Sequence, residues 1–141
     1  MHRIDFFYET DFLLNEEPGY RTWVRDIIVS EKRSPGAITF IFCDDDYLLE
    51  LHQKYLNKND YTDIISFDYS EGDVISGDIF ISIPRLKENA ASFGCRFEDE
   101  LIRVMCHGIL HLVGYKDKTP GEIEKMREKE NEKMKMFHVE H

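Results

Sequence analysis

The sequence predicts one domain over residues 1–141, of the α/β or α+β class, built around a single mixed sheet. A length of 141 residues suits one domain of ordinary size and leaves no room for two catalytic domains. Segments typical of strands come early and alternate with helical segments, while helices dominate the end of the chain. Hydrophobic residues make up 42% and charged residues 33% of the chain, which is the usage of a globular protein rather than of a disordered one.

The first half of the chain is expected to alternate strand and helix. Residues 2–9 are rich in Ile, Phe and Tyr and predict a strand. Over residues 20–30, apolar side chains recur at spacings of three and four, which predicts a helix with one buried stripe. After a Ser-Pro-Gly break, the β-branched and aromatic run at 36–45 predicts the next strand. Residues 44–46 can cap a second helix, whose buried side is expected to consist of Leu48, Leu49, Leu51 and Tyr55.

The second half is expected to hold two more strands and three helices. Residues 61–69 and 77–83 are short apolar runs, close enough to form a hairpin or neighbouring strands. Pro84 begins a helix, and another runs from Cys95 until Gly114 can take the left-handed position that ends it. Residues 119–137 predict the last helix, which includes the charged run at 127–135. The order of the strands in the sheet does not follow from these patterns.

Charge and cysteine content narrow the range of functions. With 18 basic and 28 acidic residues the net charge is −10, so a nucleic-acid partner must be held by a local basic patch or a bound cation. Three cysteines without a C-x-x-C pair argue against a disulfide framework and for a reducing, cytoplasmic compartment. The N-terminal segment has no signal-peptide core, and no apolar run approaches the roughly 20 residues of a membrane span. We therefore expect no membrane partner.

The strongest chemical signal lies between His107 and Asp117. On a helix His107 and His111 lie one turn apart on one face, so their rings can share a metal ion. Gly114 can end that helix, and the reversal can return Asp117 as a third ligand. Two imidazoles and a carboxylate form an open zinc site whose fourth ligand is a water that ionises near neutral pH. A buried or solvated histidine pair on a core helix is the alternative. Gly108 costs the helix roughly 1 kcal/mol relative to alanine, so a close approach of substrate or backbone is expected there.

The same spacing invites comparison with zinc peptidases. Their H-E-x-x-H motif carries a glutamate that acts as the general base, and in this sequence that position is Gly108. The two histidines of the motif are present but its glutamate base is absent, which argues against a zinc metalloprotease.

The stretch HGILHLVGY, from His107 to Tyr115, resembles the mark of the YbeY endoribonucleases of bacterial rRNA maturation, H-G-x-L-H-L-x-G-Y-D-H. The family's aspartate falls on Lys116 and its third histidine ligand on Asp117, and an aspartate also binds zinc. TDIISF at 62–67 is similar to P-T-[DN]-V-L-S-F, and SGDIFIS at 76–82 to G-D-I-x-I-S. In the family's L-N-x-x-Y-R segment, the arginine usually implicated in activity is replaced by Leu56.

The resemblance implies a zincin-like α+β domain with a mixed sheet of about four strands and about five helices. It implies a metal-dependent hydrolase that cuts single-stranded RNA, in small-subunit rRNA maturation and ribosome quality control, and no DNA partner is expected. We interpret the chemistry as attack of metal-bound hydroxide on phosphorus, with one Zn²⁺ held by His107, His111 and Asp117 and no side-chain base assigned. The alternative is a ribosome-associated assembly or binding factor with a structural or weakly catalytic metal, which Leu56 and the acidic charge favour.

Several weaker candidates flank this motif. Lys116 and Arg85 are the candidate phosphate contacts, although solvated helix faces are the alternative for all the basic residues of a possible patch, which also includes Lys87, Arg96, Arg103 and Lys118. Asp63 and Asp78 can orient the metal ligands as outer partners or, equally, cap backbone amides. The terminal His138 and His141 can chelate metal or belong to a frayed end.

Overall fold

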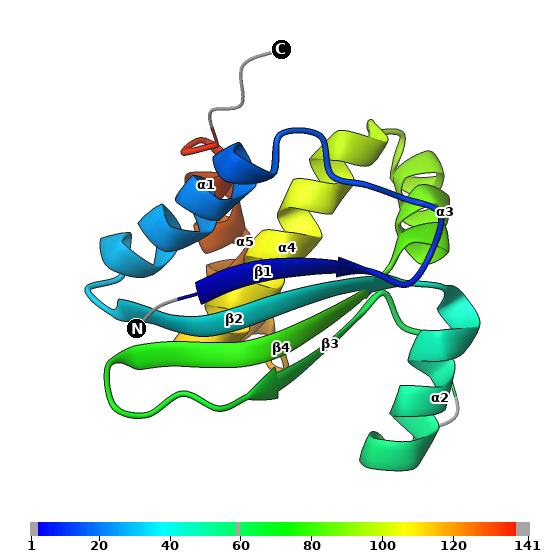
Figure 1. Cartoon of the computed structure of the whole chain (residues 1–141), viewed down its shortest axis with the longest axis horizontal. Coiled ribbons are helices and arrows are strands. Elements are labelled where there is room, and N and C mark those ends of the chain that lie inside the picture. Colours follow the sequence, from blue (N-terminus) through cyan, green and yellow to red (C-terminus); the bar gives the residue numbers. More distant parts are fainter. Residues whose placement is uncertain (1–2, 59, 138–141) are drawn as a thin grey trace.

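The computed structural model describes residues 3–58 and 60–137, which form a four-stranded mixed sheet and five helices (Figure 1). This confirms the α+β class with about four strands and five helices. His138 and His141 lie outside the described residues. Along the chain the elements are β1 (Arg3–Tyr8), α1 (Glu17–Ser30), β2 (Ser34–Cys43), α2 (Asp45–Leu56), β3 (Ile64–Asp68), β4 (Val74–Ser82), α3 (Ile83–Phe93), α4 (Phe97–Val113) and α5 (Pro120–Met134).

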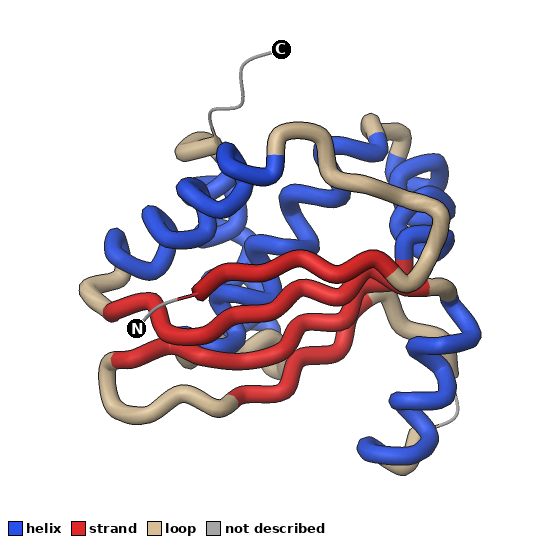
Figure 2. The backbone as a smooth tube through the Cα atoms, viewed as in Figure 1, coloured by secondary structure: helices blue, strands red, loops and turns tan. Residues whose placement is uncertain are grey.

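The strands lie in the order β1-β2-β4-β3, as Figure 2 shows from one edge of the sheet to the other. β1, β2 and β4 are parallel, and β3 is antiparallel to β4. The register aligns Phe6 with Phe40, and Phe40 with Ile79. The short connection between β3 and β4 makes them a hairpin, as parallel neighbours require a longer crossover.

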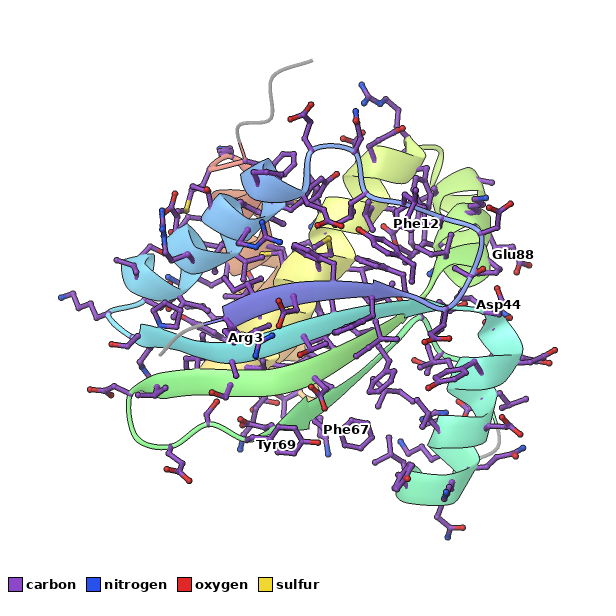
Figure 3. The ribbon with its side chains drawn as sticks, viewed as in Figure 1. Arg3, Phe12, Asp44, Phe67, Tyr69 and Glu88 are labelled. Atoms are coloured by element: carbon purple, nitrogen blue, oxygen red, sulfur yellow. The ribbon has the colours of Figure 1, made fainter. Side chains whose placement is uncertain are left out.

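Helices α1, α4 and α5 lie on one side of the sheet and enclose the main core, while α2 extends away at one end (Figure 1). Phe12 reaches inward from the loop after β1 and packs against Phe42 and Phe97 (Figure 3). A second, small cluster of Cys43, Leu48 and Ile65 joins α2 to the sheet. Among the described residues, no helix combines the length and the apolar character needed to cross a membrane.

Two details differ from the expectations for α1 and α2. Helix α1 begins at Glu17 rather than near residue 20, because Pro18 suits a first helical turn. In α2, Tyr55 is 57% exposed whereas His52 is only 7% exposed, so the prediction that Tyr55 is buried was wrong. The reason is that α2 extends beyond the sheet, and the His52 Nδ1–H donates to the Asp60 carbonyl at 2.8 Å instead of facing solvent.

At Gly108, α4 packs closely against side chains of the sheet. A β-carbon at this position would lie 2.9 Å from Ile64 Cδ1 and 3.0 Å from Ile79 Cγ2. The expected close approach therefore exists, but sheet side chains supply it rather than a substrate or a backbone. Gly114 follows α4 with a φ of 121°, a conformation that favours glycine and turns the chain back toward the helix.

Candidate metal centre

The three predicted ligands converge at the end of α4. His107 and His111 share one face of the helix, with ring centroids 4.5 Å apart and ring planes at 81°. After the turn at Gly114, Asp117 Oδ2 lies 3.2 Å from His107 Nε2 and 3.5 Å from His111 Nε2. One ligand atom from each of the three residues falls within 4.8 Å of the others. This spacing fits a single cation between them.

The second nitrogen of each ring is held by an acceptor. His107 Nδ1 lies 2.7 Å from Glu130 Oε2, and His111 Nδ1 lies 3.0 Å from the Tyr115 carbonyl oxygen. A carbonyl or an ionised carboxylate can only accept, so each Nδ1 carries the proton. When the rings are neutral, each Nε2 is left with a lone pair on the side of Asp117, which is how outer partners orient metal-binding histidines.

Glu130 joins the histidine pair to two arginines. Its side chain is buried and lies 2.8 Å from Arg103 Nη1 and 3.3 Å from Arg127 Nη1. Burial raises the pKa of Glu130, but hydrogen bonds from His107 and Arg103 outweigh it, so the pKa lies below its usual value. Burial lowers the pKa of His107, but the hydrogen bond to Glu130 and the charges of Glu130 and Asp117 raise it above its usual value. Glu130 is thus an ionised acceptor at neutral pH.

The donor set fits a catalytic metal. Two neutral imidazole nitrogens and one carboxylate oxygen match the three protein ligands of open zinc sites. The side chains of His107, His111 and Asp117 remain 21%, 31% and 38% exposed, which leaves one side of the group open to water or substrate.

A cleft of about 620 Å³ adjoins this group. The lining residues of α4 include Glu100, Arg103 and His107, and those of α5 include Ile123 and Arg127. The lining also includes Asp63 just before β3, Ile64 at the start of β3, and Asn89 and Phe93 of α3. The cleft therefore offers both carboxylates and guanidinium groups, together with exposed apolar side chains.

The predicted outer partners, Asp63 and Asp78, are separated by the sheet. Asp63 lines the cleft and accepts a hydrogen bond from Asn89 Nδ2 at 3.4 Å, and burial raises its pKa. Asp78 follows Gly77, which faces Leu112 of α4, so Asp78 points to the other side of β4 and interacts with Tyr69. The expectation that Asp78 orients a metal ligand is therefore not supported by its position.

The two candidate phosphate contacts, Lys116 and Arg85, differ in exposure and in their ion pairs. Lys116 is exposed and directly precedes Asp117. Arg85 is bound by Asp45 at 2.6 Å and by Glu88 at 3.2 Å, and it is not among the residues that line the cleft. Lys116 does not line the cleft either, but it adjoins a candidate ligand, whereas the charge of Arg85 is already neutralised by Asp45 and Glu88.

Glu130 and Arg127 were not predicted as site residues. Both lie in the charged run at 127–135, which has the composition of a solvated helix face. A signal was nevertheless present, because Met126, Glu130 and Lys133 are spaced four and three residues apart, as the members of a buried stripe are. All three are buried.

Comparisons with known proteins agree with the residues that carry the resemblance. The model of the family described as Endoribonuclease YbeY matches residues 9–138. The Endoribonuclease YbeY of Flavobacterium psychrophilum is 57% identical over 96% of this chain and 97% of its own, and that of Flavobacterium johnsoniae is 53% identical over 97% and 99%. The solution structure of TM1509 from Thermotoga maritima matches with a TM-score of 0.64 and 26% identity, over 95% of this chain and 91% of that one. The chain therefore belongs to the YbeY endoribonuclease family.

Proposed function

We propose that this chain is a single-domain, metal-dependent endoribonuclease that cuts single-stranded RNA, in maturation of small-subunit rRNA and ribosome quality control. The observation that carries the proposal is the convergence of His107, His111 and Asp117 beside a cleft. It occurs in a chain whose family and curated relatives carry the name endoribonuclease. The ribosomal role and the cytoplasmic location rest on the family resemblance and on the cysteine content.

The proposed chemistry assigns a task to each side chain of the group. His107, His111 and Asp117 would hold one Zn²⁺, which would supply Lewis acidity toward the phosphodiester and lower the pKa of a bound water. Glu130 and the Tyr115 carbonyl keep both rings in the tautomer that binds metal. A side chain at position 108 would collide with Ile64 and Ile79, so this helix has no room for the glutamate base of a zinc peptidase.

Substrate binding is assigned to local features, because the net charge of −10 repels RNA at long range. Arg127 is 60% exposed in the cleft and Lys116 adjoins Asp117, so both can contact phosphates next to the scissile bond. Phe93 and Ile123 present exposed apolar surface in the same cleft. An unstacked base can lie on such surface, whereas the stacked bases of a duplex cannot, which favours single strands.

The test combines RNA cleavage with metal removal. The purified protein is expected to cut single-stranded RNA and spare duplex RNA, to lose this activity with a chelator, and to regain it with Zn²⁺. Elemental analysis is expected to find about one transition-metal ion per chain. His111→Ala should reduce the rate by more than about 100-fold, beyond the effect of losing an outer partner alone, with a folded chain by circular dichroism. Unchanged cleavage by His111→Ala would rule out the metal mechanism.

A second candidate function is an assembly factor of the small ribosomal subunit with little catalysis. Leu56, which stands where the family has an arginine, is exposed at the end of α2 and is not among the residues that line the cleft. Co-sedimentation with small subunits that survives His111→Ala, together with weak cleavage by the unmodified protein, would favour this alternative.

A further inference from the structure

We propose that Tyr115 and Glu31 are positioning residues, which determine the ring nitrogen that His111 offers to the metal and hold the turn that carries Asp117. The inference rests on the metal site of the proposed function. It concerns a pair of residues 84 positions apart, neither of which is a ligand.

Tyr115 is held by three hydrogen bonds and one contact to its ring. Its backbone N–H donates to the Leu110 carbonyl at 3.0 Å, and its own carbonyl accepts from His111 Nδ1 at 3.0 Å. Its hydroxyl donates to Glu31 Oε1 at 2.6 Å. Lys129 Nζ lies 5.7 Å from the centre of its ring. Rotation of the ring or of the peptide group would therefore break at least one of these contacts.

Glu31 is itself fixed by ion pairs. It caps the C-terminus of α1, and its Oε2 lies 2.7 Å from Lys133 Nζ and 3.3 Å from Lys129 Nζ. The side chains of Glu31 and Lys133 are only 10% and 2% exposed, so the pair is shielded from solvent. A charged acceptor held by two ammonium groups has little freedom to move. The hydroxyl of Tyr115 is thus tied to α1 and, through Glu31, to α5.

The hydrogen bond between Tyr115 and Glu31, called the anchor below, affects the three candidate ligands in two ways. The Tyr115 carbonyl can only accept, so it requires the proton of His111 on Nδ1 and leaves Nε2 free. Asp117 follows Tyr115 by two residues, so the same anchored segment places its Oδ2 3.5 Å from His111 Nε2. Without the anchor, His111 would exchange between tautomers and only a fraction of the molecules would be competent to bind metal. The apparent dissociation constant rises as that fraction falls.

A purely structural role for the hydroxyl is the alternative, and the chain offers a matched control for it. The Tyr8 hydroxyl donates to Glu17 Oε2 at 2.5 Å, which is also a tyrosine–glutamate bond to α1. Tyr8 stacks on Phe42 of β2 rather than following a ligand helix. Tyr115→Phe and Tyr8→Phe therefore remove the same kind of bond, but only one of them lies next to the metal group.

The first measurement uses the metal-free protein. Long-range ¹H–¹⁵N NMR at alkaline pH reports which nitrogen of each neutral imidazole carries the proton. We expect His111 to be protonated on Nδ1 in the unmodified protein and in Tyr8→Phe, and to lose a substantial part of this preference in Tyr115→Phe. An unchanged His111 tautomer in Tyr115→Phe would overturn the proposal. Because this comparison needs neither metal nor RNA, it decides the role of Tyr115 even if the protein binds no Zn²⁺ and the proposed function fails.

The second measurement is the Zn²⁺ affinity, by competition with a chromophoric chelator. Tyr115→Phe is expected to weaken binding by about 3- to 10-fold, less than the loss of a direct outer partner, while Tyr8→Phe leaves it unchanged. Glu31→Gln keeps an acceptor for the hydroxyl but loses the ion pairs, so it should unfold at lower urea yet bind Zn²⁺ more tightly than Tyr115→Phe. If affinity instead follows stability across all three variants, the network is only structural and the proposal fails.

Discussion

Glu130 is the residue that most directly couples the ligand helix to the rest of the molecule. It accepts from the His107 ring and from Arg103, although 27 positions separate Glu130 from that arginine. Its negative charge raises the basicity of the His107 ring and balances two guanidinium groups at the cleft. A neutral acceptor of the same shape would retain the hydrogen bond but not the charge.

Glu130→Gln is therefore expected to weaken Zn²⁺ binding by about 10-fold, at the lower end of the range for outer partners of metal ligands. Titration against a competing chelator measures this. Glu128→Gln, two positions away on the same helix and 63% exposed, is the control and should bind normally. Equal affinities for the two variants would contradict an electrostatic role for Glu130.

Glu31 is expected to make the stability of the fold depend on pH. Burial raises the pKa of Glu31, but hydrogen bonds from Lys133 and Tyr115 outweigh it and lower the pKa from 4.5 to about 2. A pKa lowered by folding means that the ionised form stabilises the native state above pH 4.5, and this contribution is lost as the pH falls toward 2. We expect the free energy of unfolding in urea to decrease over this interval, and to decrease less in Glu31→Gln. Parallel curves for the two proteins would show that Glu31 does not contribute.

At the scale of elements, the contact of α4 with the sheet positions the ligands. Gly108 lies between His107 and His111 and allows α4 to approach Ile64 and Ile79 closely. The packing of Gly108 against the sheet therefore fixes the position of α4, and with it the positions of His107 and His111.

Gly108→Ala tests this contact. Overpacking costs about 1–3 kcal/mol, and the higher helix propensity of alanine returns up to about 1 kcal/mol, so we expect a net destabilisation of about 1–2 kcal/mol in urea unfolding. Gly121→Ala is the control, because a β-carbon there would meet nothing within 4 Å. It should be neutral or slightly stabilising. A stabilising Gly108→Ala would indicate that α4 can move away from the sheet without cost.

At the scale of the whole molecule, an acidic protein must bind an acidic polymer. The net charge of −10 gives no long-range attraction, so affinity depends on a small number of cations near the cleft. Arg127 is the most accessible of the arginines that line it.

Arg127→Ala is expected to raise KM for single-stranded RNA with a smaller effect on kcat. Each phosphate contact in a single strand contributes about 0.7 to the slope of log affinity against log salt, so the slope should become shallower by about that amount. Cleavage kinetics from low to moderate salt measure both quantities. Arg25→Ala, on the exposed side of α1, is the matched control. Identical salt slopes for Arg127→Ala and the unmodified protein would exclude a phosphate contact at this position.

The sequence alone predicted the features that depend on neighbours along the chain. The spacing of His107 and His111 places both rings on one helical face, and Gly114 ends that helix so that Asp117 can return. The strands and helices followed from periodicity for the same reason. The prediction that Tyr55 is buried was wrong, because burial at the end of a helix depends on what lies beside it. For the same reason, the side of the sheet on which Asp78 lies did not follow from the sequence.

Residue patterns predicted a single mixed sheet with helices, most of the elements and the three candidate ligands, because helical spacing, capping and chain reversal act over a few residues. The family resemblance narrowed the class to α+β. The strand order, the approach of α4 to the sheet, and the partners Glu130 and Glu31 of the site became known only from the folded chain. These contacts join residues 23 and 84 positions apart. Packing of the shared core brings these residues into contact. A local sequence pattern therefore does not indicate which buried carboxylate will bind which ring.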